Sequence, residues 1–248
     1  MLLIVLVIVA GRTWLDRMES QSWKNPLWVG VYPLNADGSP TAAAYIAALS
    51  PSDFGAIETF FAREAHRFAV TVEEPIHVEL YPEGKELPPQ LPRGAGPLGV
   101  MWWSLKMRWF AVHASKVPGR TPSRVRIFVL YHDPASLQTV PDSHGLQKGL
   151  LGVVHAFAAQ SMTGTNNIVI SHELLHTLGA TDKYDLGTGA PLYPSGYAAP
   201  DHQPRYPQQQ AEIMAGRRAL SATDFEMPAS LRDVVVGAAT AGEIRWTN

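Results

Sequence analysis

The sequence predicts an α+β or α/β fold, in which one mixed, twisted sheet is backed by helices. Two observations lead to this expectation. Segments with the alternating or β-branched pattern of strands are interspersed with segments whose apolar residues recur at helical spacing. The chain has 248 residues, of which 46% are apolar and 17% charged, so it is long and apolar enough to bury a core.

Four segments have the composition of strands, and each is bounded by turn or loop residues. They are residues 26–34, 76–81, 125–133 and 149–160. The first is followed by turn residues from 35 to 40, and the second by a loop rich in Pro and Gly from 82 to 99.

Helices are expected where apolar residues recur every three or four positions. The first runs from 50 to 68, with Ser50 at the N-cap and Pro51 at the first helical position. Residues 101–114 fit a strand or a helix, and the absence of Gly and Pro favours a helix whose tryptophans lie in the core. Further helices are predicted at 168–178 and 231–246, whereas 186–210 lacks periodicity and predicts an irregular loop.

Charge and cysteine content exclude several classes of function. The net charge of −2 gives no electrostatic reason to expect a nucleic acid or an anionic membrane surface as partner. The chain contains no cysteine, which excludes disulfides, thiolate metal sites and cysteine nucleophiles.

The first 25 residues are interpreted as an apolar export or anchor segment followed by a linker. The apolar run from Leu2 to Ala10 is about half the ~20 residues that a spanning helix needs. It resembles the core of a secretory signal, although no Lys or Arg precedes it and no cleavage site is clear. A buried first strand is the alternative. The favoured interpretation predicts a protein that is exported or membrane-anchored, outside the cytoplasm, with membrane attachment through this segment.

The stretch SHELLHTLGATDKYD, residues 171–185, contains the candidate metal-binding and catalytic residues. On a helix, His172 and His176 are four residues apart and project from one face, so both rings reach one zinc ion at about 2.0–2.1 Å. Glu173 lies beside them, near enough to contact a metal-bound water. The opposite helix face is apolar and suits the core.

A catalytic zinc site needs a third ligand and one open position. Gly179 suits the left-handed residue that ends a helix, and the turn that follows returns Asp182 toward the histidines. Other residues that could supply the third ligand are Glu212, Asp185 and His202. His155 lies in an apolar strand and is expected to be a satisfied core histidine.

HELLHTLGATD resembles the HExxHxxGxxH/D signature of the metzincin class of zinc metallopeptidases. The aspartate form, with Tyr184 two residues later, is similar to the snapalysin-type and immune-inhibitor-A-type proteases. AEIMAGR, residues 211–217, resembles the metzincin Met-turn, with Met214 in place of its methionine, although Met214 also suits an ordinary core position. The resemblance covers residues 166–217, roughly a fifth of the chain. Some metzincins have a tyrosine where this chain has Gly216, so a substrate-polarising tyrosine must lie elsewhere, at Tyr184 or Tyr206.

This resemblance implies an α+β, metzincin-like zincin domain over residues 26–248. Its upper part, 26–180, would hold the sheet and the active-site helix, and its lower part, 181–248, would be mostly irregular. Zinc would be held by His172, His176 and Asp182, and Glu173 would be the general base for attack of water on a peptide bond.

The expected substrate is a peptide or protein, cleaved internally. It would pair as an extended chain with residues 149–158, and the loop 186–210 would form the lower wall of the cleft. Two alternatives stay open: a zinc hydrolase of a non-peptide amide, and a non-catalytic zinc-containing binding or regulatory protein. The intact Glu173 argues against the second, because a structural site needs no base.

Overall fold

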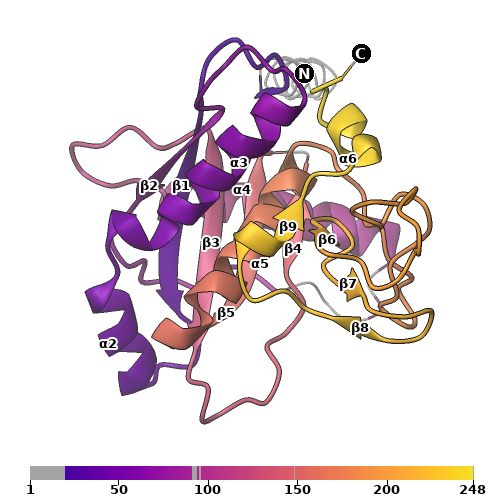
Figure 1. Ribbon diagram of the computed structural model, residues 1–248. Coiled ribbons are helices and arrows are strands. Elements are labelled where there is room, and N and C mark those ends of the chain that lie inside the picture. The colour runs from indigo at the N-terminus through magenta and orange to yellow at the C-terminus, as the bar shows by residue number, and fades with distance from the viewer. Residues whose placement is uncertain (1–19, 91–93, 95, 148, 248) are drawn as a thin grey trace.

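The centre of the structure is a five-stranded sheet in the order β2-β1-β3-β5-β4 (Figure 1). The strands are β1 (Leu27–Asn35), β2 (Ile76–Leu80), β3 (Val125–His132), β4 (His144–Leu146) and β5 (Leu151–Phe157). All neighbours are parallel except β4, which runs antiparallel to β5 at one edge. This computed structural model describes residues 20–90, 94, 96–147 and 149–247, so the predicted export or anchor segment lies outside the described residues.

Helices cover both faces of this sheet, and the expected α+β class is confirmed. The helices of the described residues are α2 (Pro40–Ala48), α3 (Gly55–Arg67), α4 (Pro97–Ala114), α5 (Thr163–Thr177) and α6 (Ala238–Glu243). Short 3-10 turns, η1 (Pro51–Phe54) and η2 (Gln160–Met162), precede α3 and α5. In that part of the chain, no helix is both long and apolar enough to cross a membrane.

The alternation along β3 divides the core into two layers. Ile127 and Val129 face the layer that contains α2, α3 and α5. Phe128 and Leu130 face the other layer, where they meet α4. Each side of the sheet is therefore covered, which explains why the parallel strands are nearly continuous in apolar residues.

The C-terminal part, residues 181–247, has little regular structure, and 186–210 is an irregular loop as predicted. Two small strand pairs stabilise the rest of this part. They are β6 (Ala211–Glu212) with β9 (Val234–Val235), and β7 (Arg218–Ala219) with β8 (Phe225–Glu226). A further 3-10 turn, η3 (Leu231–Asp233), precedes β9.

Several expectations about secondary structure were wrong. The predicted helix at 231–246 is divided into η3, β9 and α6, because the β-branched residues of β9 pair with β6. The Gly237 N–H then donates to Glu212 Oε1, and the helix begins one residue later. The helix α2 and the edge strand β4 were not expected.

The helix expected at 101–114 is confirmed as α4, but the expected placement of its tryptophans in the core was wrong for two of them. Trp103 is buried, whereas Trp102 and Trp109 are exposed. The strand expected at 149–160 is confirmed as β5. It does not form the open edge of the sheet, because β4 pairs with its first half.

Candidate metal centre

Helix α5 presents both histidines of the motif and is fixed at its start by two buried asparagines. The Asn166 side chain donates to Phe157 O and accepts from Phe157 N, at the end of β5. Asn167 donates to Asp53 O, in η1. These contacts set the depth and direction of α5, because they join its first turn to two other elements.

The imidazoles of His172 and His176 have their ring centroids 4.7 Å apart, and both are oriented by backbone carbonyls. Nδ1 of His172 lies 2.9 Å from Ile213 O, and Nδ1 of His176 lies 2.8 Å from Ala180 O. A carbonyl oxygen only accepts hydrogen bonds, so each Nδ1 must carry a proton. In neutral rings, Nε2 is then a lone-pair donor, as a metal ligand requires.

Asp182 completes a convergent group with the two rings. Its Oδ1 lies 3.2 Å from Nε2 of His172 and 3.1 Å from Nε2 of His176. This oxygen is out of contact with solvent, and it receives no hydrogen bond from either imidazole when the rings are neutral and their protons are on Nδ1. Three acceptor atoms that meet in this way need positive charge between them, either as ring protons or as one metal ion.

When no metal is bound, the same arrangement of side chains favours protonated, positively charged imidazole rings. Burial opposes ionisation of Asp182, but its contacts with both histidines hold the pKa of its carboxyl far below the usual range. Burial likewise disfavours the charged form of His172, but hydrogen bonding to Asp182 and the charge of Glu173 raise the pKa of this imidazole. The group therefore favours positive charge between its members, carried either by ring protons or by a metal ion.

The end of α5 returns the chain to the histidines as the sequence predicts. Gly179 has a φ of 101°, in the left-handed region, and the Ala180 N–H donates to Leu175 O at 3.0 Å. This is the hydrogen-bond pattern of a Schellman end. It also brings the Ala180 carbonyl to His176, so the same turn orients one ligand and leads to Asp182.

The residues on both sides of Asp182 are held by a carboxylate from α6. Glu243 accepts from the Thr181 N–H at 2.9 Å, from the Thr181 hydroxyl at 2.7 Å and from Lys183 Nζ at 2.8 Å. Burial raises the pKa of Glu243, but the bonds from Lys183 and Thr181 outweigh it and lower the pKa. Lys183 N donates to Met214 O at 2.9 Å, so Asp182 sits between anchored neighbours.

Glu173 is buried beside the two rings. Its carboxylate and the two ring nitrogen donors all lie within 4.8 Å of one another. Its Oε2 is buried and unpaired within the described part of the chain. Burial raises the pKa of Glu173, although the histidines oppose this shift. Asp182 has one oxygen nearly equidistant from both Nε2 atoms, so it suits the third ligand and leaves Glu173 available as a base.

The edge strand β4 lies directly against this part of α5. A Cβ atom at Gly145 would be 2.4 Å from His176 Cβ and 2.5 Å from Glu173 O. Glycine is therefore required where the strand passes Glu173, because no L side chain fits. Gly145 gave no signal in the sequence, since a three-residue strand has no periodicity.

Met214 lies in a tight turn below α5. The N–H groups of Ala215 and Gly216 both donate to Glu212 O, at 3.1 and 3.0 Å, and Gly216 has a φ of 68°. Met214 is fully buried in the same apolar cluster as Leu174. The turn places Ile213 O against His172, so this segment orients a ring as well as packing beneath the helix.

The other residues considered as third ligand lie in different environments. Glu212 is fully buried and accepts from the Ala215 N–H, the Gly237 N–H and the Thr240 hydroxyl. Burial raises the pKa of Glu212, and these bonds oppose the shift. Asp185 accepts from Gly187 and Thr188 in a surface turn. The His202 ring is exposed and bonds to Pro204 O.

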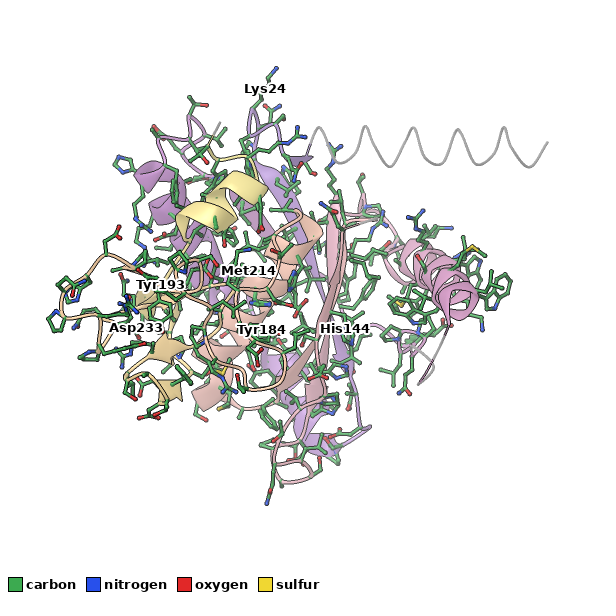
Figure 2. All side chains as sticks on the ribbon, turned by 90° about the vertical axis from the view of Figure 1, so that its right-hand side faces the viewer. Lys24, His144, Tyr184, Tyr193, Met214 and Asp233 are labelled. Carbon is green, nitrogen blue, oxygen red and sulfur yellow. The ribbon has the colours of Figure 1, made fainter. Side chains whose placement is uncertain are left out.

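The two tyrosines of interest are placed differently. Tyr184 lines the cleft beside Asp182 and Glu173, and burial together with these negative charges raises the pKa of its phenol. Figure 2 shows Tyr184 near the centre of the molecule, between Met214 and His144. Tyr206 instead pairs with Tyr197, with 3.0 Å between the hydroxyl oxygens, and is not among the described residues that line the cleft.

The site opens into a cleft of about 750 Å³. One wall is formed by residues 140–146, which include β4, and the other by Tyr184, Leu186 and residues 215–217. Among the described lining residues, the loop 186–210 contributes Leu186 and Gly189, so the lower wall is shared with the turn after Met214.

Behind β4, a second hollow of about 720 Å³ contains a histidine pair that the sequence did not single out as functional. His132 Nε2 lies 2.8 Å from His155 Nδ1. His155 was expected in the core, but it is partly exposed and lines both hollows. Burial and the neighbouring His132 lower the pKa of His155 to about 4.

Comparison with known protein families gives no match, and no curated protein sequence is significantly similar to this chain. The chemistry of the site therefore has to be argued from its residues. The sequence identified the histidines, Glu173 and Asp182. It gave no indication of Gly145 or Glu243, because their contacts join segments far apart along the chain.

Proposed function

We propose that this protein is a zinc-dependent metallopeptidase with a metzincin-like architecture. The observation that carries the proposal is the position of Asp182 Oδ1, 3.1–3.2 Å from Nε2 of both His172 and His176 while both Nδ1 atoms face carbonyls. Two imidazole nitrogens and one carboxylate oxygen are a ligand set typical of catalytic zinc. The buried Oδ1, which lacks a donor in the described part of the chain, fits a metal at this point.

A zinc ion held by these three residues would supply Lewis acidity and lower the pKa of water to about 7. Glu173 is adjacent to the ligands without being needed as one, which suits a general base that takes a proton from water and delivers it to the leaving amine. Its burial raises its pKa toward the range in which a carboxyl exchanges protons efficiently. The intact base supports an enzyme over a structural zinc protein.

The substrate we propose is an extended peptide or protein segment, cut internally. The strand β4 is the last of the sheet in the described residues, and His144, Gly145 and Leu146 line the cleft. An extended chain can add to such an edge by main-chain hydrogen bonds. The edge partner is therefore β4 and not residues 149–158. Tyr184 faces the cleft from the other wall and is the tyrosine placed to contact substrate.

The test combines metal analysis with peptide cleavage. Purified protein is expected to contain one zinc ion and to cleave members of a peptide library, and a chelator should stop cleavage. His176→Ala should lose the metal. His113→Ala is the matched control, because His113 also lies in the last turn of a helix with Nδ1 near a carbonyl, and is exposed. Zinc retained in His176→Ala at full stoichiometry would overturn the ligand set.

Glu173→Gln separates an enzyme from a binding protein. The amide keeps the shape of the side chain and removes the base, so zinc should stay bound while cleavage falls by about 10²–10⁴-fold. Unchanged cleavage would contradict the role of Glu173. If the unaltered, zinc-loaded protein cleaved no peptide in a diverse library, a regulatory or binding function would replace the proposed one.

A further inference from the structure

Helix α4 is apolar on two opposite faces. One face packs on the sheet through Trp103, Met107 and Phe110, which are buried. The opposite face is exposed. Figure 2 shows α4, in magenta, projecting from the far side of the sheet from α5. A helix with one apolar face normally buries that face, so a second apolar face left exposed requires an explanation.

The exposed face is a continuous stripe. Its residues are Leu98, Met101, Trp102, Leu105, Trp109 and Val112. Their spacings of three, one, three, four and three residues place them on one side of the helix. Trp102 is 61% exposed and Trp109 is 63% exposed, although large aromatic residues are normally buried. An exposed apolar surface of this kind marks a binding surface.

The part of the sequence that contains this stripe is rich in basic residues. Residues 88–132 contain seven of the 20 Lys and Arg residues and none of the 22 Asp and Glu residues. They are Arg93, Lys106, Arg108, Lys116, Arg120, Arg124 and Arg126. Lys106 is exposed beside the stripe, with its Nζ 5.9 Å from the centroid of the Trp102 ring. Arg120 is paired with Glu79, whereas Lys106 and Lys116 are exposed, so these two lysines supply the positive charge considered at this face.

The chain that precedes the described residues joins the domain near the same region. Ser20 and Ser22 line a hollow together with Arg120 and Arg124, which belong to the loop after α4. The apolar run from Leu2 to Ala10 lies in the preceding part of the sequence. Ser20, the first described residue, therefore lies beside the loop that follows α4.

We propose that the exposed face of α4 lies on the surface of an anionic lipid bilayer. Tryptophans favour the headgroup region of a membrane, and an apolar helix face enters it by about 5–10 Å. Basic residues beside that face add attraction to anionic lipids. Pairing of two copies through this face would bring two basic surfaces together, which is unfavourable. The apolar segment Leu2–Ala10 has no acidic residue to complement the surface.

The absence of cysteine allows the contact to be measured at one position. Leu105→Cys in the full chain would carry an environment-sensitive fluorophore, with vesicles of phosphatidylcholine alone or mixed with phosphatidylglycerol. We expect a blue shift of the emission with the anionic vesicles, weakened by salt. Thr223→Cys is the control, since this exposed residue lies between β7 and β8, and that hairpin is on the opposite side of the molecule in Figure 2. Its label should not respond.

Two sets of variants test the chemistry of the contact. Lys106→Gln and Lys116→Gln should each weaken binding to anionic vesicles by roughly fivefold. The pair Trp102→Ser and Trp109→Ser should abolish the response of the label at position 105, with the far-ultraviolet circular dichroism unchanged.

Several results would overturn the proposal. One is co-sedimentation of the protein with vesicles while the label at 105 stays in water, which would mean attachment through the N-terminus alone. Another is a shift that depends on protein concentration without lipid, which would identify a second copy as the partner. A third is a label already shielded in free protein and exposed when residues 2–10 are removed, which would identify that segment as the cover. None of these results bears on the metal site.

Discussion

The upper and lower parts of this molecule contribute to the same site but are stabilised differently. In the upper part, residues 26–180, a sheet and packed helices position His172, Glu173 and His176 through backbone ladders and apolar contacts, to which two buried asparagines at the start of α5 add side-chain bonds. In the lower part, Asp182 and the turn around Met214 are positioned by buried side chains that bond to the backbone. The carboxylates of Glu212 and Glu243 are the main examples.

The comparison teaches that the positions of the proposed metal ligands should differ in their sensitivity to mutation of the residues that support them. The two histidines depend on a helix whose stability is shared among many contacts. The third ligand depends on a few polar groups, each of which leaves buried partners unpaired if it is removed. The four predictions below test this difference, from the largest expected effect to the smallest.

Asp182→Ala should remove metal from a folded protein. It deletes one of three proposed ligands, so the loss of zinc affinity should exceed the roughly 10–100-fold that is typical for an outer contact. Asp185→Ala, a substitution three residues along the same loop, should retain zinc, because its carboxylate caps a surface turn. The measurement is zinc content after dialysis. Retention of zinc in Asp182→Ala together with its loss in Asp185→Ala would reverse the assignment.

Glu212→Ala should be the most destabilising change in the lower part. It leaves the Gly237 N–H and the Thr240 hydroxyl without their acceptor and removes one of the two acceptors of the Ala215 N–H, at a cost of about 3–5 kcal/mol. Glu226→Ala removes a partly exposed ion pair with Arg218 and should cost less than about 1 kcal/mol. Urea unfolding of both variants measures the difference. Equal losses of unfolding free energy in the two variants would show that buried carboxylates do not stabilise the lower part of the molecule more than exposed ones do.

Met214→Leu should have a small effect on stability and none on metal content. The volume is nearly conserved, so the expected cost is under about 1.5 kcal/mol. Met107→Leu makes the same change in the upper core, where Met107 is also fully buried, and should cost a similar amount. Thermal unfolding and zinc analysis of the two variants provide the comparison. Zinc lost only from Met214→Leu would mean that the methionine does more than pack.

The histidine pair of the upper part should make stability depend on pH. The pKa of His155 is about 4 in the folded protein, against 6.5 when unperturbed, because of burial and the neighbouring His132. Between these values the unfolded chain binds a proton that the folded protein does not. The free energy of unfolding therefore falls as the pH drops from 6.5 toward 4.

His155→Gln should reduce this fall in the free energy of unfolding between pH 6.5 and 4. The expected reduction is on the order of 1 kcal/mol, because solvent reaches part of the ring and screens the effect. Denaturant unfolding at several pH values, with chelator in both samples, measures it without a contribution from metal. An identical pH slope in the two proteins would contradict the effect of burial on this ring.

Periodic patterns made the upper part predictable. The strands β1, β2, β3 and β5 and the helices α3, α4 and α5 follow from alternation or helical spacing, and Gly179 marked the end of α5. The helix α2 was missed, although Ser39 caps it by accepting from the Ala42 N–H. The strand β4 could not be found, because three residues carry no periodicity.

The lower part was predicted less well, for a physical reason. Its order comes from contacts between single side chains and distant backbone groups, such as Glu243 with Thr181, 62 residues apart. Composition and spacing do not encode such pairs. The predicted helix at 231–246 had apolar residues at suitable positions, but pairing of β9 with β6 outweighed local helical preference. At the site, the four-residue spacing was enough to predict that the two histidines lie together. The predicted end of the helix at Gly179 was enough to place Asp182 near them.

The contact from Glu243 also bears on the order in which the protein matures. During synthesis, both histidines leave the ribosome well before Glu243, which holds the residues on either side of Asp182. A nascent chain can thus contain the whole HELLHTLGATD stretch while its last ligand is still unfixed. Under the proposed function, tight capture of metal would then wait for the docking of α6, so hydrolytic activity would be withheld until that segment has been made.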